Sequence, residues 1–293
     1  MRRMIRLLWL ILFLAPAAQA QSIILSAADD TPAIRRFTDS LSRLRPQDQV
    51  SFRTLDELRS EHSPGPLLIT LDEQTLRWRL ALENGPSTLA MRISRIEGQA
   101  LLAGRSVAGV TLLWSDPPPL RQLRLVRQVM PKAQRVGLLY DGASAFLIEE
   151  YRQAAVSLGL ELHTQPWSPD ASRRPLHKLL DDSDLLLGID APRLYNADSI
   201  KTLLLTSYAK NRPLIGPTAA FVRAGSLAST YSSEQDWLAE LVRWLDVPHE
   251  HWPASAYPQH FQVISNRQVG RALGLDIPSD SRLTRALAEG DGP

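Results

Sequence analysis

The sequence predicts an α/β protein of two lobes, each built on a doubly wound, mostly parallel sheet. Short apolar runs of strand length alternate with amphipathic helical stretches along most of the 293-residue chain. This alternation occurs in two sets, and a proline-rich break at 117–119 separates them. With 44% hydrophobic and 22% charged residues, the composition is that of a globular chain long enough for two cores.

The first set begins with the apolar run SIILS at 22–26. Ile34, Phe37 and Leu41 then recur at helical spacing, which predicts a helix over 32–44. The other strands expected in this set are 50–52, 67–70, 87–93 and 107–114, and the other helices are 55–59 and 73–82. Segment 91–104 is basic and irregular. The first lobe is therefore expected to span 21–116.

The second set repeats the alternation more cleanly. Its expected strands are 135–140, 160–165, 184–188, 213–216 and 226–231. Its expected helices are 119–130, 145–158, 174–180, 198–210, 218–223 and 234–245. The second lobe is therefore expected to span 117–246. Residues 247–293 form a connector rich in Pro, His and Trp, then a strand at 261–264 and two helices, so the chain crosses between the lobes more than once.

The first twenty residues have the layout of an export signal. Arg2, Arg3 and Arg6 precede the apolar run 7–16, and Ala18-Gln19-Ala20 is a small-x-small end. This layout is typical of a cleaved secretory signal, and the apolar run is too short for a permanent transmembrane helix. A retained membrane anchor is the alternative. The sequence thus predicts a signal peptide at 1–20 and a soluble exported protein without a membrane span after cleavage, periplasmic in a bacterium.

Charge and cysteine content exclude some functions. The formal net charge of +2 falls to about −1 when three arginines leave with the signal. Because no basic patch stands out, no nucleic-acid partner is expected. The chain has no cysteine, so a core rather than disulfides must stabilise it, and no lipid can be attached to a cysteine.

Polar residues follow most of the expected strands. Ligands of open parallel sheets bind beyond the carboxyl ends of the strands, and two facing lobes would bring such ends together around a small polar ligand. The candidate ligand-binding residues are Asp29, Thr70, Ser115, Asp116, Asp141, Asp190, Tyr195, Thr218 and Tyr231. Most of them precede an expected helix, so the alternative is that they only cap helices.

No pattern typical of a catalytic or metal site is found. The sequence has no G-x-S-x-G elbow, no H-E-x-x-H pair and no Walker loop, so we expect no catalytic residue, no cofactor and no enzyme. His249 and His251 flank Glu250, but no third metal ligand is evident nearby, and no metal is expected. A hydrolase that uses the carboxylates Asp116 and Asp190 is the enzymatic alternative.

Three segments carry a resemblance to a known family. They are GVTLLWSDPPPLRQLRLVRQVMPKAQRVGLLYD, NRPLIGPTAAFVRAGSLASTYSS and FQVISNRQVGRALGLDIP, in this order. They resemble the substrate-binding proteins of ABC transporters, in the group linked to aromatic amino acids and similar small ligands, over roughly the last two-thirds of the chain. The resemblance implies a fold like type I periplasmic binding proteins, with hinged lobes. It also makes 213–216 and 226–231 consecutive strands of the second lobe.

The first lobe departs from that family. There, the third strand leads into a G-T-x-x-A turn at a helix N-terminus, which can hold a ligand carboxylate on free backbone N–H groups. Here the stretch is Thr70-Leu71-Asp72-Glu73, and its acidic pair would repel a carboxylate. An aromatic amino acid ligand therefore does not follow from the resemblance.

Two functions follow from these observations. The first is a periplasmic solute-binding protein, the substrate-binding component of an ABC-type uptake system with a permease partner, whose lobes close on a small polar ligand. The alternative is a periplasmic sensor or interaction protein of the same fold with a divergent or lost pocket. Such a protein would contact a receptor, a kinase or another envelope protein.

Overall fold

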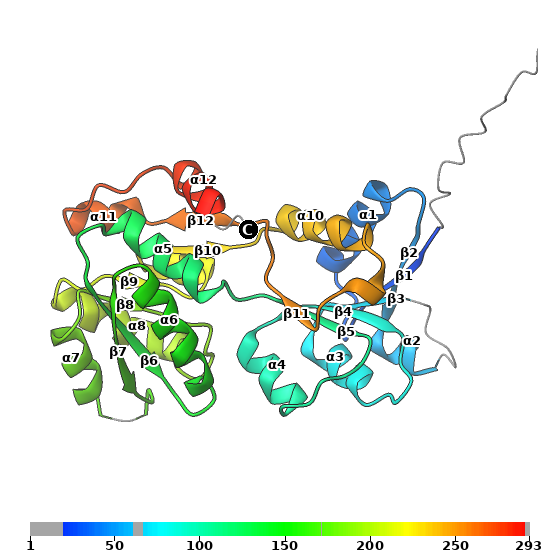
Figure 1. The fold of residues 1–293 in the computed structure, drawn as a ribbon, viewed down its shortest axis with the longest axis horizontal. Coiled ribbons are helices and arrows are strands. Elements are labelled where there is room, and N and C mark those ends of the chain that lie inside the picture. Colours follow the sequence, from blue (N-terminus) through cyan, green and yellow to red (C-terminus); the bar gives the residue numbers. More distant parts are fainter. Residues whose placement is uncertain (1–19, 61–66, 171, 291–293) are drawn as a thin grey trace, which may run out of the picture.

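The computed structural model describes residues 20–60, 67–170 and 172–290. The chain folds into two lobes, each holding a six-stranded sheet covered by helices (Figure 1). The α/β class and the two-lobe arrangement are confirmed. Residues 1–19 of the expected signal lie outside the described residues. Within the described ranges, no helix combines the length and the apolar character that a membrane span requires.

The sheet of the first lobe is parallel throughout, with the strand order β11-β5-β4-β3-β1-β2. Its strands are β1 (Ser22–Ala27), β2 (Gln49–Thr54), β3 (Leu67–Thr70), β4 (Ser87–Ile93), β5 (Val110–Trp114) and β11 (Ser255–Ala256). Its helices include α1 (Pro32–Leu44), α2 (Leu55–Ser60), α3 (Glu73–Leu80) and α4 (Arg95–Leu102). Because all these strands run the same way, their carboxyl ends meet at one edge of the sheet.

The sheet of the second lobe has the order β12-β10-β9-β8-β6-β7, and only β12 runs antiparallel to its neighbour. Its strands are β6 (Arg135–Tyr140), β7 (Glu161–Pro166), β8 (Leu185–Leu187), β9 (Leu214–Ile215), β10 (Ala228–Tyr231) and β12 (Gln262–Ser265). Its helices are α5 (Pro119–Val129), η1 (Ala145–Leu147), α6 (Ile148–Ser157), α7 (Arg174–Asp181), α8 (Ala197–Ala209), α9 (Ala219–Ala224), α11 (Arg267–Ala272) and α12 (Asp280–Gly290).

Helix α10 (Glu234–Leu245) lies on the first lobe, although the sequence pattern places 234–245 with the second. Trp237 and Leu241 pack in one core cluster with Phe37 and Leu41 of α1, and Figure 1 shows α10 beside α1. An amphipathic face indicates that a helix buries one side, and it does not indicate against which sheet. The chain therefore crosses back into the first lobe directly after β10.

Segment 91–104, irregular by its sequence pattern, instead completes β4 and forms α4. Ser94 caps this helix: its hydroxyl accepts the Glu97 N–H at 3.2 Å, and the Glu97 carboxylate accepts the Ser94 N–H at 2.8 Å. Arg92 has φ 60°, and the pairing of β4 with β5 shifts register between Ala90 and Ile93. A bulge of this kind redirects a strand end, and here it sets the start of α4.

The stretch 213–231 forms β9, α9 and β10, as the sequence pattern predicts. Only glycine fits at position 216, because a Cβ there would lie 2.4 Å from the Ser226 hydroxyl oxygen and 2.7 Å from the Phe221 Cβ. The tight exit from β9 leads directly into the short helix α9, and the next strand, β10, begins at Ala228. This explains why the two strand-length segments of β9 and β10 lie so close together in the sequence.

Three crossovers join the lobes: 115–118 after β5, 232–233 after β10, and 257–261 between β11 and β12. Glu240 of α10 is fully buried and holds the third crossover, accepting the His260 N–H and pairing with the His260 ring Nδ1, each at 2.8 Å. The Arg121 guanidinium of α5 lies 3.9 Å from the centre of the Phe261 ring. Helices of both lobes thus contact this crossover.

Candidate functional site

An ion pair joins the two lobes at the carboxyl end of the first sheet. Arg95, the first residue of α4, donates from Nη1 to Glu150 Oε2 of α6 at 2.6 Å and to the Tyr257 hydroxyl at 2.6 Å. We call the Arg95–Glu150 pair the interlobe bridge. It links the first lobe, the second lobe and the third crossover. These groups therefore change neighbours if the lobes move apart.

Aromatic rings surround the Arg95 guanidinium. Its Cζ lies 5.9 Å from the ring centre of Trp114, 5.7 Å from that of Phe146 and 5.9 Å from that of Tyr257, within the range of cation–π attraction. A cavity of about 360 Å³ adjoins it. Burial tends to lower the pKa of Arg95, but the hydrogen bonds to Glu150 and the Tyr257 hydroxyl outweigh burial and raise this pKa. Arg95 therefore stays positively charged at the lobe junction, where Glu150 and the Tyr257 hydroxyl fix its position.

Asp116 lies in the first crossover, behind the start of α4. One of its carboxylate oxygens, Oδ1, accepts the Arg95 backbone N–H at 2.7 Å. Burial raises the pKa of Asp116 to about 7, and the negative charge of Asp190 adds to the shift. The site thus holds a carboxyl group that changes charge near neutral pH.

Asp190 lies on the second lobe, in the loop after β8, near enough for its charge to raise the pKa of Asp116. Its carboxylate has neither a hydrogen-bond nor an ion-pair partner among residues 20–60, 67–170 and 172–290. Burial raises its pKa to about 6, and Glu97 of the first lobe contributes. Asp116 and Asp190, two residues predicted from the sequence, therefore lie near each other at the lobe junction. When both carboxylates are ionised, their negative charges repel each other.

At the carboxyl ends of the first-lobe strands, several backbone N–H groups donate hydrogen bonds to carboxylates of the chain itself. Asp72 accepts the Thr75 N–H at the start of α3 at 2.8 Å and the Ala28 N–H after β1 at 2.6 Å. At the start of α4, Glu97 and Asp116 accept N–H groups in the same way. A ligand carboxylate finds these donors already used. Asp72 thus satisfies one N–H at the start of α3 and one after β1 from within the chain.

Three of the candidate residues take part in internal contacts. Thr70 is fully buried. Tyr195 is 4% exposed and donates from its hydroxyl to the Leu187 carbonyl at 3.4 Å. Asp141 accepts the Ser144 N–H at 2.9 Å and the Ser144 hydroxyl at 2.7 Å, which closes a local turn. The Tyr195 and Asp141 side chains thus hold their strand ends in shape, whereas the buried Thr70 hydroxyl has no hydrogen-bond partner in the described part of the chain.

The other candidates lie at strand ends with at least part of the side chain accessible. Asp29 is exposed after β1, and Ser115 is partly exposed beside Asp116. Tyr231 ends β10 and is partly exposed. Thr218 precedes α9, and its side chain makes no capping hydrogen bond. Of these four residues, Ser115 is adjacent to the acidic pair.

Arg95, Glu97, Glu150 and Tyr257 also lie at the lobe junction, and none of them is among the residues predicted from the sequence. Ser94-x-x-Glu97 is a capping-box pattern that predicts a helix start, and it was the available signal for α4. Glu150 and Tyr257 carry no comparable signal, because they reach the junction from α6 and from the third crossover.

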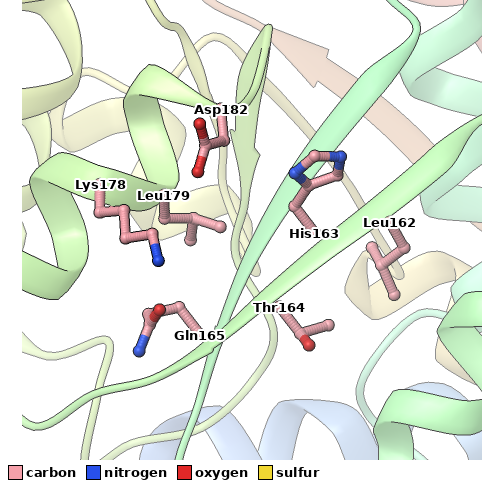
Figure 2. A pocket seen from close by; sticks show the side chains of 7 residues that line it. All are labelled: Leu162, His163, Thr164, Gln165, Lys178, Leu179 and Asp182. Atoms are coloured by element: carbon pink, nitrogen blue, oxygen red, sulfur yellow. The ribbon is translucent and has the colours of Figure 1, made fainter.

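Other features of the molecule lie away from the junction. Within the described ranges, no group of three or more His, Asp or Glu residues is placed so that it could hold a metal ion. This includes the surroundings of His249 and His251. Side chains of the edge strand β7, of the last turn of α7 and of Asp182 just after it line a cavity of about 370 Å³. Figure 2 shows these side chains. The cavity contains none of the predicted ligand-binding residues.

Solved structures of other proteins share this fold. No protein-family model matches the chain, and no curated protein matches it. A ligand-free, open substrate-binding protein with adhesive properties from Clostridium difficile matches with a TM-score of 0.67 at 14% identity, over 89% of this chain and 97% of that chain. An ABC domain in complex with L-Trp from Streptococcus pneumonia matches with a TM-score of 0.58 at 15% identity, over 90% of this chain and 98% of that chain. The expected resemblance to substrate-binding proteins is confirmed at the level of the fold.

Proposed function

We propose that the chain is an exported solute-binding protein that closes its two lobes on a small polar ligand. One observation carries the proposal: Asp116 of the first crossover accepts the backbone N–H of Arg95, the first-lobe member of the interlobe bridge, and lies near enough to Asp190 of the second lobe for the two charges to interact. The three crossovers are the natural hinge, since a few residues between rigid lobes can absorb the rotation. An ABC-type permease in the envelope is the proposed recipient of the ligand, and the periplasm the proposed location.

The ligand that best fits this junction carries an amine or guanidinium group and presents no carboxylate to the first lobe. Asp190 is a carboxylate without a partner in the described part of the chain, and Asp116 and Glu97 add negative charge around it. Buried charges are stable in proteins when they are paired. A ligand cation would supply the missing partner. A ligand carboxylate would meet N–H groups that Asp72 and Glu97 already occupy.

The test is a thermal-unfolding screen of the exported protein against polyamines, guanidino compounds, amino acids, small carboxylates, sugars and nucleosides. A ligand that binds only the folded state raises the unfolding midpoint by mass action. We expect cations to raise it, and Asp190→Asn to remove the shift. Asp182→Asn is the matched control, because Asp182 is an exposed carboxylate at the cavity beside β7 and α7, away from the lobe junction. A carboxylate ligand whose effect survives Asp190→Asn would overturn the proposal.

Binding of a cation should also depend on pH. The cation favours ionised Asp116 and Asp190, whose pKa values are raised to about 7 and about 6. The affinity is therefore expected to be full at pH 8 and to fall as the pH drops through 7 and 6. Titration calorimetry at pH 5, 6.5 and 8 measures this directly. An affinity that rises on acidification would exclude these carboxylates as the binding groups.

A second candidate function is an interaction protein of the same fold. The interlobe bridge favours it, because Arg95 already supplies a cation to the junction and joins the first lobe to the second through Glu150. In that case no small molecule in the screen shifts the unfolding midpoint. Crosslinking in the intact cell envelope then identifies a protein partner, whether a receptor, a kinase or another envelope protein.

A further inference from the structure

At the start of the first lobe, the backbone of Gln21 lies against the buried carboxylate of Asp48. The Gln21 backbone N–H donates to Asp48 Oδ1 at 3.0 Å, and the Gln21 carbonyl accepts the Gln49 N–H at 2.8 Å, so the sheet contacts begin at this residue. The Asp48 side chain is 1% exposed, and its other oxygen accepts from the buried Arg45. The Gln21 side-chain oxygen Oε1 is also buried and has no partner in the described part of the chain.

The cavity around Gln21 has more negative than positive charge. It measures about 580 Å³ and includes Ala20 and Gln21 in its lining. Its charged or titratable lining groups are Arg45, Asp48, Asp246, His249 and Glu250. Arg45 pairs with both Asp48 and Asp246, so a single arginine is shared between two carboxylates, and His249 lies 3.4 Å from Glu250. One additional cation next to Asp48 would reduce this imbalance.

We propose that the chain is processed at the Ala20–Gln21 peptide bond and that Asp48 binds the new α-ammonium group of Gln21. An endopeptidase of the export pathway would hydrolyse the bond: one water is added, Ala20 leaves with the carboxylate, and the Gln21 amine takes up a proton. The small-x-small end Ala18-Gln19-Ala20 places the cleavage at this bond. The proposal is independent of the ligand-binding function.

The charge change has a direct structural consequence. The amide at Gln21 has one N–H and no charge, whereas the ammonium has three N–H groups and one positive charge. The hydrogen bond to Asp48 thereby becomes a charged pair with a carboxylate that is shielded from water. An extra N–H donor also becomes available to the unpaired Gln21 Oε1. Processing would thus fasten the new terminus at the amino end of β1, an inner strand of the first sheet.

The pairing also protects the terminus chemically. A free N-terminal glutamine cyclises when its neutral amine attacks its own side-chain amide carbon, which forms the ring C–N bond and releases ammonia. A protonated amine has no lone pair for this attack. As long as Asp48 holds the ammonium, the mature protein should keep an uncyclised glutamine.

The first experiment is the intact mass and N-terminal sequence of the protein recovered after export of the full chain. We expect a chain that starts at Gln21 and has not lost ammonia. The second is the pH dependence with which an amine-specific acylating reagent modifies the terminus. The usual pKa of an α-amino group is about 8, and pairing should raise this pKa by about one unit, which slows acylation about eightfold at pH 7.5.

The matched control retains Ala20 as the first residue. It keeps the Gln21 N–H to Asp48 hydrogen bond but moves the charge one residue away, so its amine should react at the ordinary rate. Asp48→Asn, starting at Gln21, should react at the ordinary rate and slowly lose ammonia. Cleavage at another bond, a cyclised terminus in the folded wild-type protein, or equal acylation rates for the Gln21 and Ala20 starts would each overturn the proposal. The Ala20 control keeps the test valid even if Asp48→Asn does not fold.

Discussion

Replacing Asp116 by asparagine should stabilise the protein at alkaline pH and have little effect at acid pH. Asp116 has its pKa raised from an ordinary value of about 3.9 to about 7, chiefly by burial. The folded state therefore binds its proton more tightly than the unfolded state does. The stability that depends on this group is fully present below pH 4 and is lost as the pH rises from 4 through 7.

The size of the effect follows from the shift. A shift of about three pKa units corresponds to about 4 kcal/mol at most, and water at the partly exposed carboxylate reduces this to roughly 1–3 kcal/mol. Asparagine removes the charge and keeps an oxygen for the Arg95 N–H, which now lies 2.7 Å from Asp116 Oδ1. We therefore expect Asp116→Asn to be more stable than the wild type at pH 8 by that amount.

Urea denaturation at pH 4 and pH 8 measures both free energies of unfolding. Asp29→Asn serves as the control, since Asp29 is exposed at another strand end and loses little water on folding. The reasoning is refuted if Asp116→Asn is less stable than the wild type at pH 8, or if its advantage is the same at both pH values. Either result would mean that the Asp116 carboxylate is not held in an unfavourable environment.

Three further predictions concern the lobes and their connections. Glu150→Gln weakens the interlobe bridge by about 0.5–1 kcal/mol and should shift the lobes toward a wider separation. Because the chain has no cysteine, two cysteines can be introduced and labelled with fluorophores to measure this separation. Glu240→Gln removes the buried charge that pairs with the His260 ring and should cost about 1–3 kcal/mol in urea denaturation at pH 7; an unchanged midpoint would contradict this. Gly216→Ala places a Cβ 2.4 Å from the Ser226 hydroxyl oxygen and should lower stability by about 1–3 kcal/mol, whereas Gly142→Ala, at a site with open space, should not.

The strands and most helices could be predicted from local pattern alone. The run RVGLLY at 135–140 forms β6 over the same residues, because a continuous apolar run flanked by polar residues fits a strand buried on both faces. Helix 234–245 was likewise predicted within its observed bounds. Its position on the first lobe was not, since the apolar face of a helix does not specify its partner.

The candidate site divides in the same way. Asp116 and Asp190 could be selected because polar residues after parallel strands are the usual ligand contacts. Thr70 and Tyr195 satisfied the same rule, and the structure buries both. A strand end gives no information on whether its last side chain faces the lobe junction or the core of its own lobe.

The sequence by itself determined two α/β lobes, the break between them and the acidic character of the strand ends. These follow from periodicity and residue chemistry over short distances along the chain. Only the tertiary structure decided that Arg95 meets Glu150, that Asp72 accepts the Ala28 N–H from the neighbouring strand end, and that Asp190 has no partner in the described part of the chain. Arg95 and Glu150 lie 55 positions apart, and their meeting depends on how the crossovers set one lobe against the other.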